Sequence, residues 1–320
     1  MTSQRIFITG ASGCIGHYLV ETLIQTTHHE LFLLMRNPAK LQIDCGVRDG
    51  IHILKGDLCH IEQFSNLLTT IDTAILTATA WGDPNETYEI NVTKTLALIN
   101  MLDPERCQQV IYFSTASILN RDNQPLPEAK RLGTDYVRTK FICHERLQEL
   151  AIAPKITTVF PTLVFGGDGK KPYSHLSGGL GDVLKWIKLI RFFRVDGSFH
   201  FVHAQDIADV VTHLAEHPPK LGDSRELVLG SKVLYVNQAI KEICRYLHLR
   251  VPVLLQIPLF LQLANVIIVL FRIQMADWDR FCLNYRHFSY QNPVSPATFG
   301  KTPYCATVDE LMKVSGVPQP

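Results

Sequence analysis

The sequence predicts an α/β fold, in which a doubly wound parallel sheet is followed by a smaller C-terminal lobe. Short apolar runs alternate with helical patterns through the first half of the chain, as they do in βαβ units. A glycine-rich turn follows the first of these runs, and the alternation weakens after about residue 165. We therefore expect a core domain over residues 1–165 and a smaller lobe over residues 166–320, some segments of which return to the core.

Six apolar runs have the length of buried strands, and each is followed by Gly, Asp, Pro or Ser. They cover residues 6–9, 31–35, 51–54, 73–76, 110–114 and 156–160. Between them, apolar residues recur three and four positions apart, the period of a helix that packs on a sheet. These predicted helices cover residues 16–26, 62–68, 88–102 and 135–150. Six strands joined in this way match a doubly wound sheet of the Rossmann type.

The turn after the first strand has the glycine spacing of a dinucleotide-binding loop, and it opens a helix as such loops do. Gly10 turns the chain, Gly13 lets backbone N–H groups approach a pyrophosphate, and Gly16 lets helix and strand pack closely. The phosphates would rest on the positive end of the helix. The predicted cofactor loop consists of Gly10, Ser12, Gly13, Cys14, Ile15 and Gly16.

The end of the second strand predicts which dinucleotide binds. Where enzymes that use NAD usually place an acid for the ribose 2′-hydroxyl, this chain has Arg36. A guanidinium can grip a 2′-phosphate through two donors, and Lys40 adds a positive charge nearby. We therefore expect NADP(H) to be preferred over NAD(H), with Asp57 and Leu58 near the adenine end. A solvated Arg36 and an Asp57 that only starts a helix stay open as alternatives.

Tyr136 and Lys140 are four residues apart, so they share one face of a predicted helix. A phenol is a poor base at neutral pH, but a nearby ammonium lowers the pKa of the phenol toward the working range. The helix follows the strand at 110–114, at the carboxyl edge where open α/β sheets bind ligands. This strand leads into Ser114, Thr115 and Ser117, one of which could orient a reacting oxygen.

These segments resemble the extended branch of the short-chain dehydrogenase/reductase superfamily, which includes epimerase/dehydratase and hydroxysteroid-dehydrogenase-like proteins. The resemblance covers most of the chain and rests further on Gly56-Asp57-Leu58, Asn91-Val92, Pro161-Thr-Leu-Val164 and Phe201-Val-His-Ala-Gln-Asp206. It implies a C-terminal substrate lobe and a catalytic triad of Thr115, Tyr136 and Lys140, with Tyr136 as the acid or base. It also implies that the cofactor is contacted by Ala78, Thr79, Ala80, Asn91, Tyr136, Lys140, Pro161 and Val164.

The chain departs from the pattern of this superfamily at three places. Phe160 stands where many relatives have Arg, and Leu119-Asn120 stands where many have Tyr-Gly. Ala116 and Ser117 follow the hydroxyl where sugar-nucleotide 4,6-dehydratases have acidic residues. Dehydratase chemistry is therefore disfavoured, and the sugar-binding residues of relatives cannot be carried over.

Together these observations predict an NADP(H)-dependent oxidoreductase that transfers a hydride to or from a carbonyl or secondary alcohol, with Tyr136 transferring the proton. A sugar-nucleotide epimerase with retained NAD is one alternative, for which Lys170, Lys171 and Arg191 could meet a diphosphate. A non-catalytic protein that binds NAD(P) is another, although the complete triad argues against it. Substrate identity, reaction direction and oligomeric state stay open.

Composition argues against several other classes. Lys plus Arg number 31 and Asp plus Glu number 30, so the net charge of +1 gives no reason to expect nucleic acid as a partner. Neighbouring cysteines are at least fourteen positions apart, which excludes CxxC sites and fits reduced thiols in a cytoplasmic protein. His213, Glu216 and His217 form an H-x-x-E-H pattern, but two prolines end that helix at once, and we expect no metal site.

Two segments raise the question of a membrane. Residues 251–271 hold no charged residue, but Pro252 and Pro258 break the start of this stretch. We favour an apolar amphipathic helix that packs on the lobe or over a lipophilic site, and contact of residues 251–273 with a membrane stays open. Residues 182–194 alternate cations with apolar residues, a pattern that suits anionic lipid but more often has one buried and one solvated face. The expected partner is thus a small-molecule substrate, and whether it is lipophilic stays open.

Overall fold

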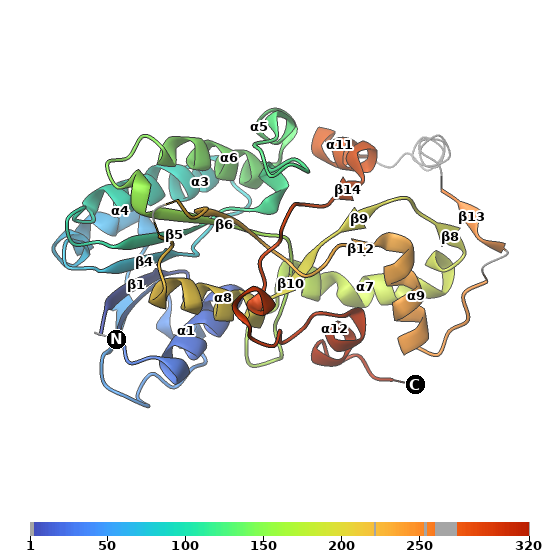
Figure 1. Ribbon diagram of the computed structural model, residues 1–320, viewed down its shortest axis with the longest axis horizontal. Helices are drawn as coiled ribbons and strands as arrows, with labels where there is room; N and C mark the ends of the chain where they lie inside the picture. Colours follow the sequence, from blue (N-terminus) through green and yellow to red (C-terminus); the bar gives the residue numbers. More distant parts are fainter. Residues whose placement is uncertain (1–2, 221, 253–254, 260–273, 320) are drawn as a thin grey trace.

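The computed structural model describes residues 3–220, 222–252, 255–259 and 274–319. Its centre is a seven-stranded sheet of parallel neighbours in the order β11-β6-β5-β4-β1-β2-β3 (Figure 1). The strands are β1 (Arg5–Thr9), β2 (Glu30–Met35), β3 (Ile51–Lys55), β4 (Thr73–Leu76), β5 (Gln109–Phe113), β6 (Ile156–Pro161) and β11 (Glu226–Leu229). The first six lie within one residue of the predicted bounds, and the doubly wound parallel sheet is confirmed.

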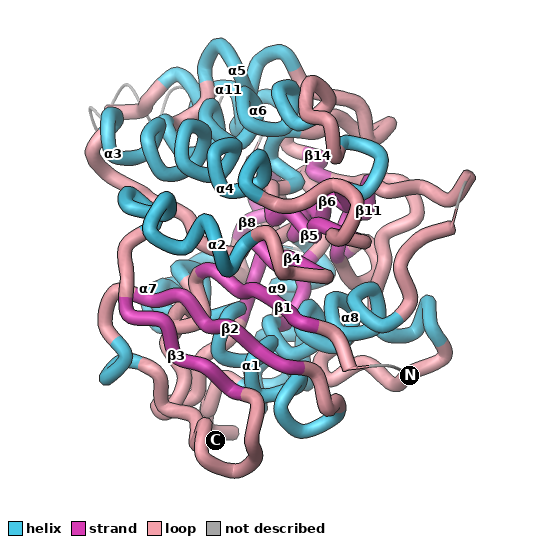
Figure 2. The backbone as a smooth tube through the Cα atoms, turned by 90° about the vertical axis from the view of Figure 1, so that its left-hand side faces the viewer, coloured by secondary structure: helices cyan, strands magenta, loops and turns pink. Residues whose placement is uncertain are grey.

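Two layers of helices cover the sheet, because successive side chains of a strand point to opposite faces. Ile6 and Ile8 of β1 pack with α1 and α8, whereas Phe7 packs in the cluster that holds α4 and α6. Figure 2 shows the two layers on either side of the strands. The helices are α1 (Cys14–Thr26), α2 (Ser65–Leu68), α3 (Pro84–Tyr88), α4 (Thr95–Met101), α5 (Pro127–Leu132), α6 (Asp135–Leu147) and α8 (Ala204–Glu216).

Two of the predicted helices are less regular than their sequence pattern suggests. The segment predicted at 62–68 is a 3₁₀ helix (Leu58–Phe64) followed by the short α2. The helix predicted at 88–102 is divided by a π-helical turn (Glu89–Lys94) between α3 and α4. A π turn widens the helix locally and is frequent at functional sites. Here it carries the buried Asn91, whose side chain bonds outside the helix.

In the part of the chain that the structure describes, the C-terminal half combines short strands with four further α-helices and also completes the core. Its β11 adds the last strand beside β6, and its α8 packs on α1. Small sheets pair β7 with β10, β8 with β13, and β9 with β12 and β14. Bounds are β7 (Leu163–Phe165), β8 (Phe193–Arg194), β9 (Ser198–Phe199), β10 (Phe201–His203), β12 (Leu234–Tyr235), β13 (Ile257–Pro258), β14 (His287–Phe288), α7 (His175–Ile190), α9 (Val236–Tyr246), α11 (Asp277–Tyr285) and α12 (Val308–Val314).

Asp206 connects the C-terminal segment at residues 304–305 to α8 through hydrogen bonds. Its carboxylate lies in the first turn of α8, is 2% exposed, and accepts hydrogen bonds from the backbone N–H of Tyr304 (2.6 Å) and Cys305 (3.1 Å). Burial raises the pKa of Asp206 to about 6, because an ionised carboxylate is poorly solvated there, although both N–H bonds lower it.

Most of the apolar stretch that the sequence raised as a membrane candidate, at 253–254 and 260–273, lies outside the described residues. Among the residues that are described, no helix has both the length and the apolar character needed to cross a bilayer.

Candidate active site and cofactor cleft

The glycine loop between β1 and α1 is shaped as a phosphate cradle. Gly10 has a φ of +74°, and a Cβ there would lie 2.6 Å from the Thr77 hydroxyl. A Cβ on Gly16 would overlap the carbonyl oxygen of Gly10. Helix α1 begins at Cys14 with Gly13 as its N-cap, so no side chain covers the first N–H groups of the helix. The loop therefore fits a dinucleotide diphosphate, which would bind to these N–H groups.

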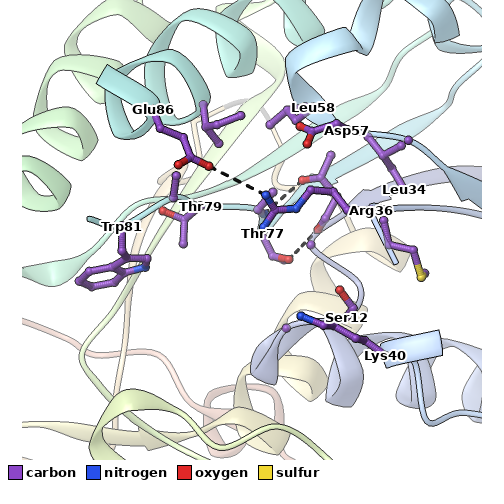
Figure 3. A pocket seen from close by; sticks show the side chains of 18 residues that line it. Ser12, Leu34, Arg36, Lys40, Asp57, Leu58, Thr77, Thr79, Trp81 and Glu86 are labelled. Carbon is purple, nitrogen blue, oxygen red and sulfur yellow. Dashed lines mark hydrogen bonds and ion pairs between the residues drawn. The ribbon is translucent and has the colours of Figure 1, made fainter. Parts of the chain in front are cut away.

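A cavity of about 460 Å³ opens beside this loop at the carboxyl ends of the strands (Figure 3). It lies where the strand order reverses, between β1 and β4, which is the usual ligand site of open α/β sheets. Nine predicted cofactor residues line it: Gly10, Ser12, Gly13, Arg36, Asp57, Leu58, Ala78, Thr79 and Ala80. Lys40, the predicted second cation, also lines it. Lining residues without a predicted cofactor contact are Thr9, Leu34, Met35, Gly56, Thr77, Trp81, Glu86 and Ile90.

The other predicted cofactor residues lie behind or beside this wall. Ile15 and Val164 pack against the apolar core, and Pro161 ends β6. The thiol of Cys14 faces the turn at Gly166, where an added Cβ would lie 3.0 Å from Sγ, and burial raises the pKa of this thiol to about 12. Cofactor contacts from these residues remain predictions.

Charged side chains gather at one end of the cleft. Arg36 points into it and lies 3.9 Å from Glu86, and both side chains are largely exposed. This long, solvated pair is weak, so the Arg36 guanidinium can turn toward an anionic ligand. Asp57 lines the same end, but one of its oxygens accepts a hydrogen bond from the backbone N–H of Cys59 (2.9 Å). Asp57 thus caps the following 3₁₀ helix, which is the simpler of its two expected roles.

Asn91 joins the cleft wall to the helix that carries Tyr136. Its Oδ1 accepts hydrogen bonds from the Thr79 hydroxyl (3.0 Å) and the Ala80 N–H (2.8 Å). Its Nδ2 donates to the Ala80 carbonyl (3.1 Å) and to the hydroxyl of Thr139 (3.1 Å) on α6. Because Asn91 and Thr139 are both buried, these hydrogen bonds fix the wall relative to α6.

The structure brings the three predicted catalytic residues together. Thr115 follows β5, and its hydroxyl accepts a hydrogen bond from the backbone N–H of Ser117 (3.3 Å) and lies close enough to Tyr136 to favour the ionised phenol. Lys140 is 2% exposed, and its Nζ lies 6.0 Å from the centroid of the Tyr136 ring. The ammonium donates a 2.7 Å hydrogen bond to the backbone carbonyl of Phe113, at the end of β5. Hydroxyl, phenol and ammonium are therefore anchored to one edge of the sheet.

The expected net lowering of the Tyr136 pKa does not occur in this geometry. Burial raises the pKa of Tyr136 to about 12, and the Thr115 hydroxyl offsets only part of the rise. Burial also lowers the pKa of Lys140 to about 8, because the ammonium loses water and gains only a neutral carbonyl partner. At neutral pH, Tyr136 is thus a neutral phenol beside a mostly protonated Lys140.

Trp81 is a site residue that the sequence did not reveal. Its ring stacks on the ring of Tyr136, with the centroids 3.6 Å apart and the planes 12° apart. His175, at the start of α7, lies on Trp81 with a centroid distance of 5.0 Å. Trp81 directly follows Ala78, Thr79 and Ala80, which were predicted to contact the cofactor. An aromatic side chain just after these residues is the sequence signal that could have indicated a site residue. The rings of Trp81 and His175 form an aromatic cover over the acid–base residue Tyr136.

The chain is similar to curated reductases and to a solved NAD complex. It is 24% identical over 250 residues to dihydroflavonol 4-reductase of Hordeum vulgare, covering 68% of each chain. It is 24% identical over 175 residues to 2-alkyl-3-oxoalkanoate reductase of Stenotrophomonas maltophilia, covering 51% of this chain and only 52% of that relative. The Bordetella bronchiseptica enzyme WbmG, crystallised with NAD, shares the fold with a TM-score of 0.64 at 14% identity, over 97% of this chain and 92% of that one.

A family model described as "NAD dependent epimerase/dehydratase family" matches residues 6–230, which include the glycine loop, the cleft and the triad. Both the fold and the resemblance to extended short-chain dehydrogenases/reductases agree with this match. The protein belongs to the NAD dependent epimerase/dehydratase family.

Proposed function

We propose that the protein is an NADP(H)-dependent oxidoreductase that reduces a carbonyl compound to a secondary alcohol. The observation that carries this proposal is the triad: the Thr115 hydroxyl, the Tyr136 phenol and the Lys140 ammonium converge at the sheet edge beside the cofactor cleft. Two similar curated proteins are named reductases, which supports reduction over epimerisation.

The protonation state of the site favours the direction of reduction. When bound, the nicotinamide supplies the hydride. Thr115 holds the substrate oxygen, and the O–H of Tyr136 gives its proton to that oxygen as negative charge develops there. The phenolate left on Tyr136 is stabilised by the nearby Lys140 ammonium until solvent returns a proton. A phenol with a raised pKa stays protonated and ready to donate at neutral pH.

The preference for NADP(H) is supported by two cations in the cleft. Arg36 and Lys40 both line it, and Arg36 has only the loose contact with Glu86 to give up. A 2′-phosphate would meet both cations, whereas a ribose hydroxyl would leave them without an anionic partner.

Calorimetric titration with NADPH and NADH tests the cofactor. NADPH should bind more tightly, and Arg36→Ala should weaken NADPH by about tenfold or more while changing NADH little. Lys55→Ala, which removes a cation from the neighbouring β3, is the matched control. Equal losses for both nucleotides in Arg36→Ala would refute the 2′-phosphate role, and binding of neither nucleotide would refute the proposal as a whole.

Oxidation of NADPH by a panel of ketones tests the reaction. Tyr136→Phe should keep nucleotide affinity and lose about 10²- to 10⁴-fold in turnover, since it removes only the transferable proton. Turnover that survives in Tyr136→Phe would show that another group provides the proton.

A further inference from the structure

Apolar side chains are exposed along one side of α7. Val183, Trp186 and Leu189 recur at three-residue steps and expose 46%, 63% and 52% of their surfaces. Residues at this spacing neighbour each other on a helix surface. Contiguous large apolar side chains on a protein surface mark a site of interaction.

The exposed apolar surface continues past the end of the helix. β8 directly follows α7 and pairs with β13, and the N–H of Ile257 donates to the carbonyl of Phe192 (2.8 Å). In this attached segment, Leu255 and Ile257 are 72% and 49% exposed. Figure 1 shows α7, β8 and β13 extending to the end of the molecule that lies farthest from β1 and the N-terminus. We define the α7 surface as Val183, Trp186, Leu189, Leu255 and Ile257.

Positive charge accompanies this surface. Residues 175–194 contain two lysines and two arginines against one acid, Asp182. That acid is already paired with Lys185 at 2.8 Å, and the side chains of Lys188 and Arg194 are exposed. Exposed Trp and aliphatic residues next to cations are the pattern of a helix that lies in the plane of an anionic lipid interface. A purely apolar protein partner would leave these cations unmatched.

We propose that the α7 surface docks on a membrane that contains anionic phospholipid. Trp186 would sit at the depth of the lipid headgroups, with Lys185 and Lys188 against the phosphates. The same helix begins at His175, which packs on Trp81 above Tyr136, so docking would bring the active-site end of α7 toward the source of a lipophilic substrate. The contact itself requires no turnover and goes beyond the proposed reaction.

Vesicle flotation of the full chain tests the proposal. The protein should float with phosphatidylcholine vesicles that carry about one third phosphatidylglycerol, and not with phosphatidylcholine alone. Lys185→Gln with Lys188→Gln should weaken binding by about tenfold, and raising salt from about 0.1 M to about 1 M should weaken it as well. Lys130→Gln and Val47→Ser, at exposed positions of the nucleotide-binding half, are the charge and apolar controls.

Brominated lipid shows whether the surface itself enters the bilayer. It should quench tryptophan fluorescence in the parent, and Trp186→Phe should abolish most of that quenching while the protein still floats. The absence of flotation with anionic vesicles would overturn the proposal. Flotation and quenching that are unchanged in all these variants would also overturn it. If the protein binds no vesicles and sedimentation shows that Trp186→Ser converts a dimer into monomers, the surface is a dimer interface and the proposal is overturned.

Discussion

Replacing Lys140 by Met should stabilise the cofactor-free protein relative to the parent. This gain in the free energy of unfolding should be larger at neutral pH than at alkaline pH. The native pKa of Lys140 is about 8, against an ordinary value of 10.5, because the ammonium is buried. In the window between these values the unfolded chain binds a proton that the native protein does not, so parent stability rises with pH there. Below pH 8, both states are charged, and the native protein bears the full penalty of about 3 kcal/mol.

The magnitude that isolates this effect is the change between two pH values. From the same pKa values, the penalty is about 3 kcal/mol at about pH 7 and about 1.4 kcal/mol at about pH 9.5. The stability of Lys140→Met minus that of the parent should therefore be about 2 kcal/mol larger at the lower pH. The Phe113 carbonyl loses its donor in the variant, but this loss is the same at both pH values and cancels.

Urea unfolding at both pH values, with Lys130→Met as a control at an exposed position, measures this difference. A stability difference that does not change with pH would show that the burial of Lys140 imposes no charge penalty. The variant should also lose most of its turnover, so a gain in stability would accompany a loss of function.

Three further predictions follow from the site and its supports. Gly16→Ala should abolish nucleotide binding in calorimetry with the fold retained by circular dichroism, because its Cβ would overlap the backbone of the cofactor loop; normal affinity would contradict the cradle. Trp81→Ala should raise KM several-fold more than it lowers kcat, because the cover over Tyr136 is lost while the proton donor stays; a change in kcat alone would argue against a positioning role. The free energy of unfolding of Asp206→Asn minus that of the parent should be about 2 kcal/mol larger at about pH 7 than at about pH 4 in urea unfolding. The raised native pKa of the parent carboxyl makes the parent lose stability as pH rises through that range; a difference that stays constant with pH would refute this.

The sequence predicts the sheet well because the central strands are buried on both faces and therefore read as apolar runs between turn residues. The glycine loop is equally visible, since its backbone geometry excludes side chains at Gly10 and Gly16. Hydrogen bonds from a side chain to a distant backbone group leave no such pattern in the sequence. Nothing in the sequence around Lys140 indicates that its ammonium is buried and donates to the carbonyl of Phe113. Burial lowers the pKa of Lys140 and raises that of Tyr136, opposite to the expected direction for the phenol.

The aromatic cover shows a second limit of sequence reasoning. Trp81, Tyr136 and His175 come from three segments that are separated by dozens of residues, and no periodicity links them. The π turn was missed for a related reason. It carries Asn91, which forms hydrogen bonds to a loop and to another helix, while the local pattern of apolar residues is that of an ordinary helix.

The return of α8 and β11 to the core constrains how the chain can be synthesised and folded. Until about residue 229 has left the ribosome, one face of α1 and the free edge of β6 have no covering partner. The first 165 residues therefore contain the nucleotide loop and the triad but not the elements that cover α1 and the β6 edge, and these contacts join segments that are far apart in sequence. A nascent chain paused in this interval would expose an unpaired strand edge and a hydrophobic helix face, which makes it a substrate for chaperones or a seed for aggregation.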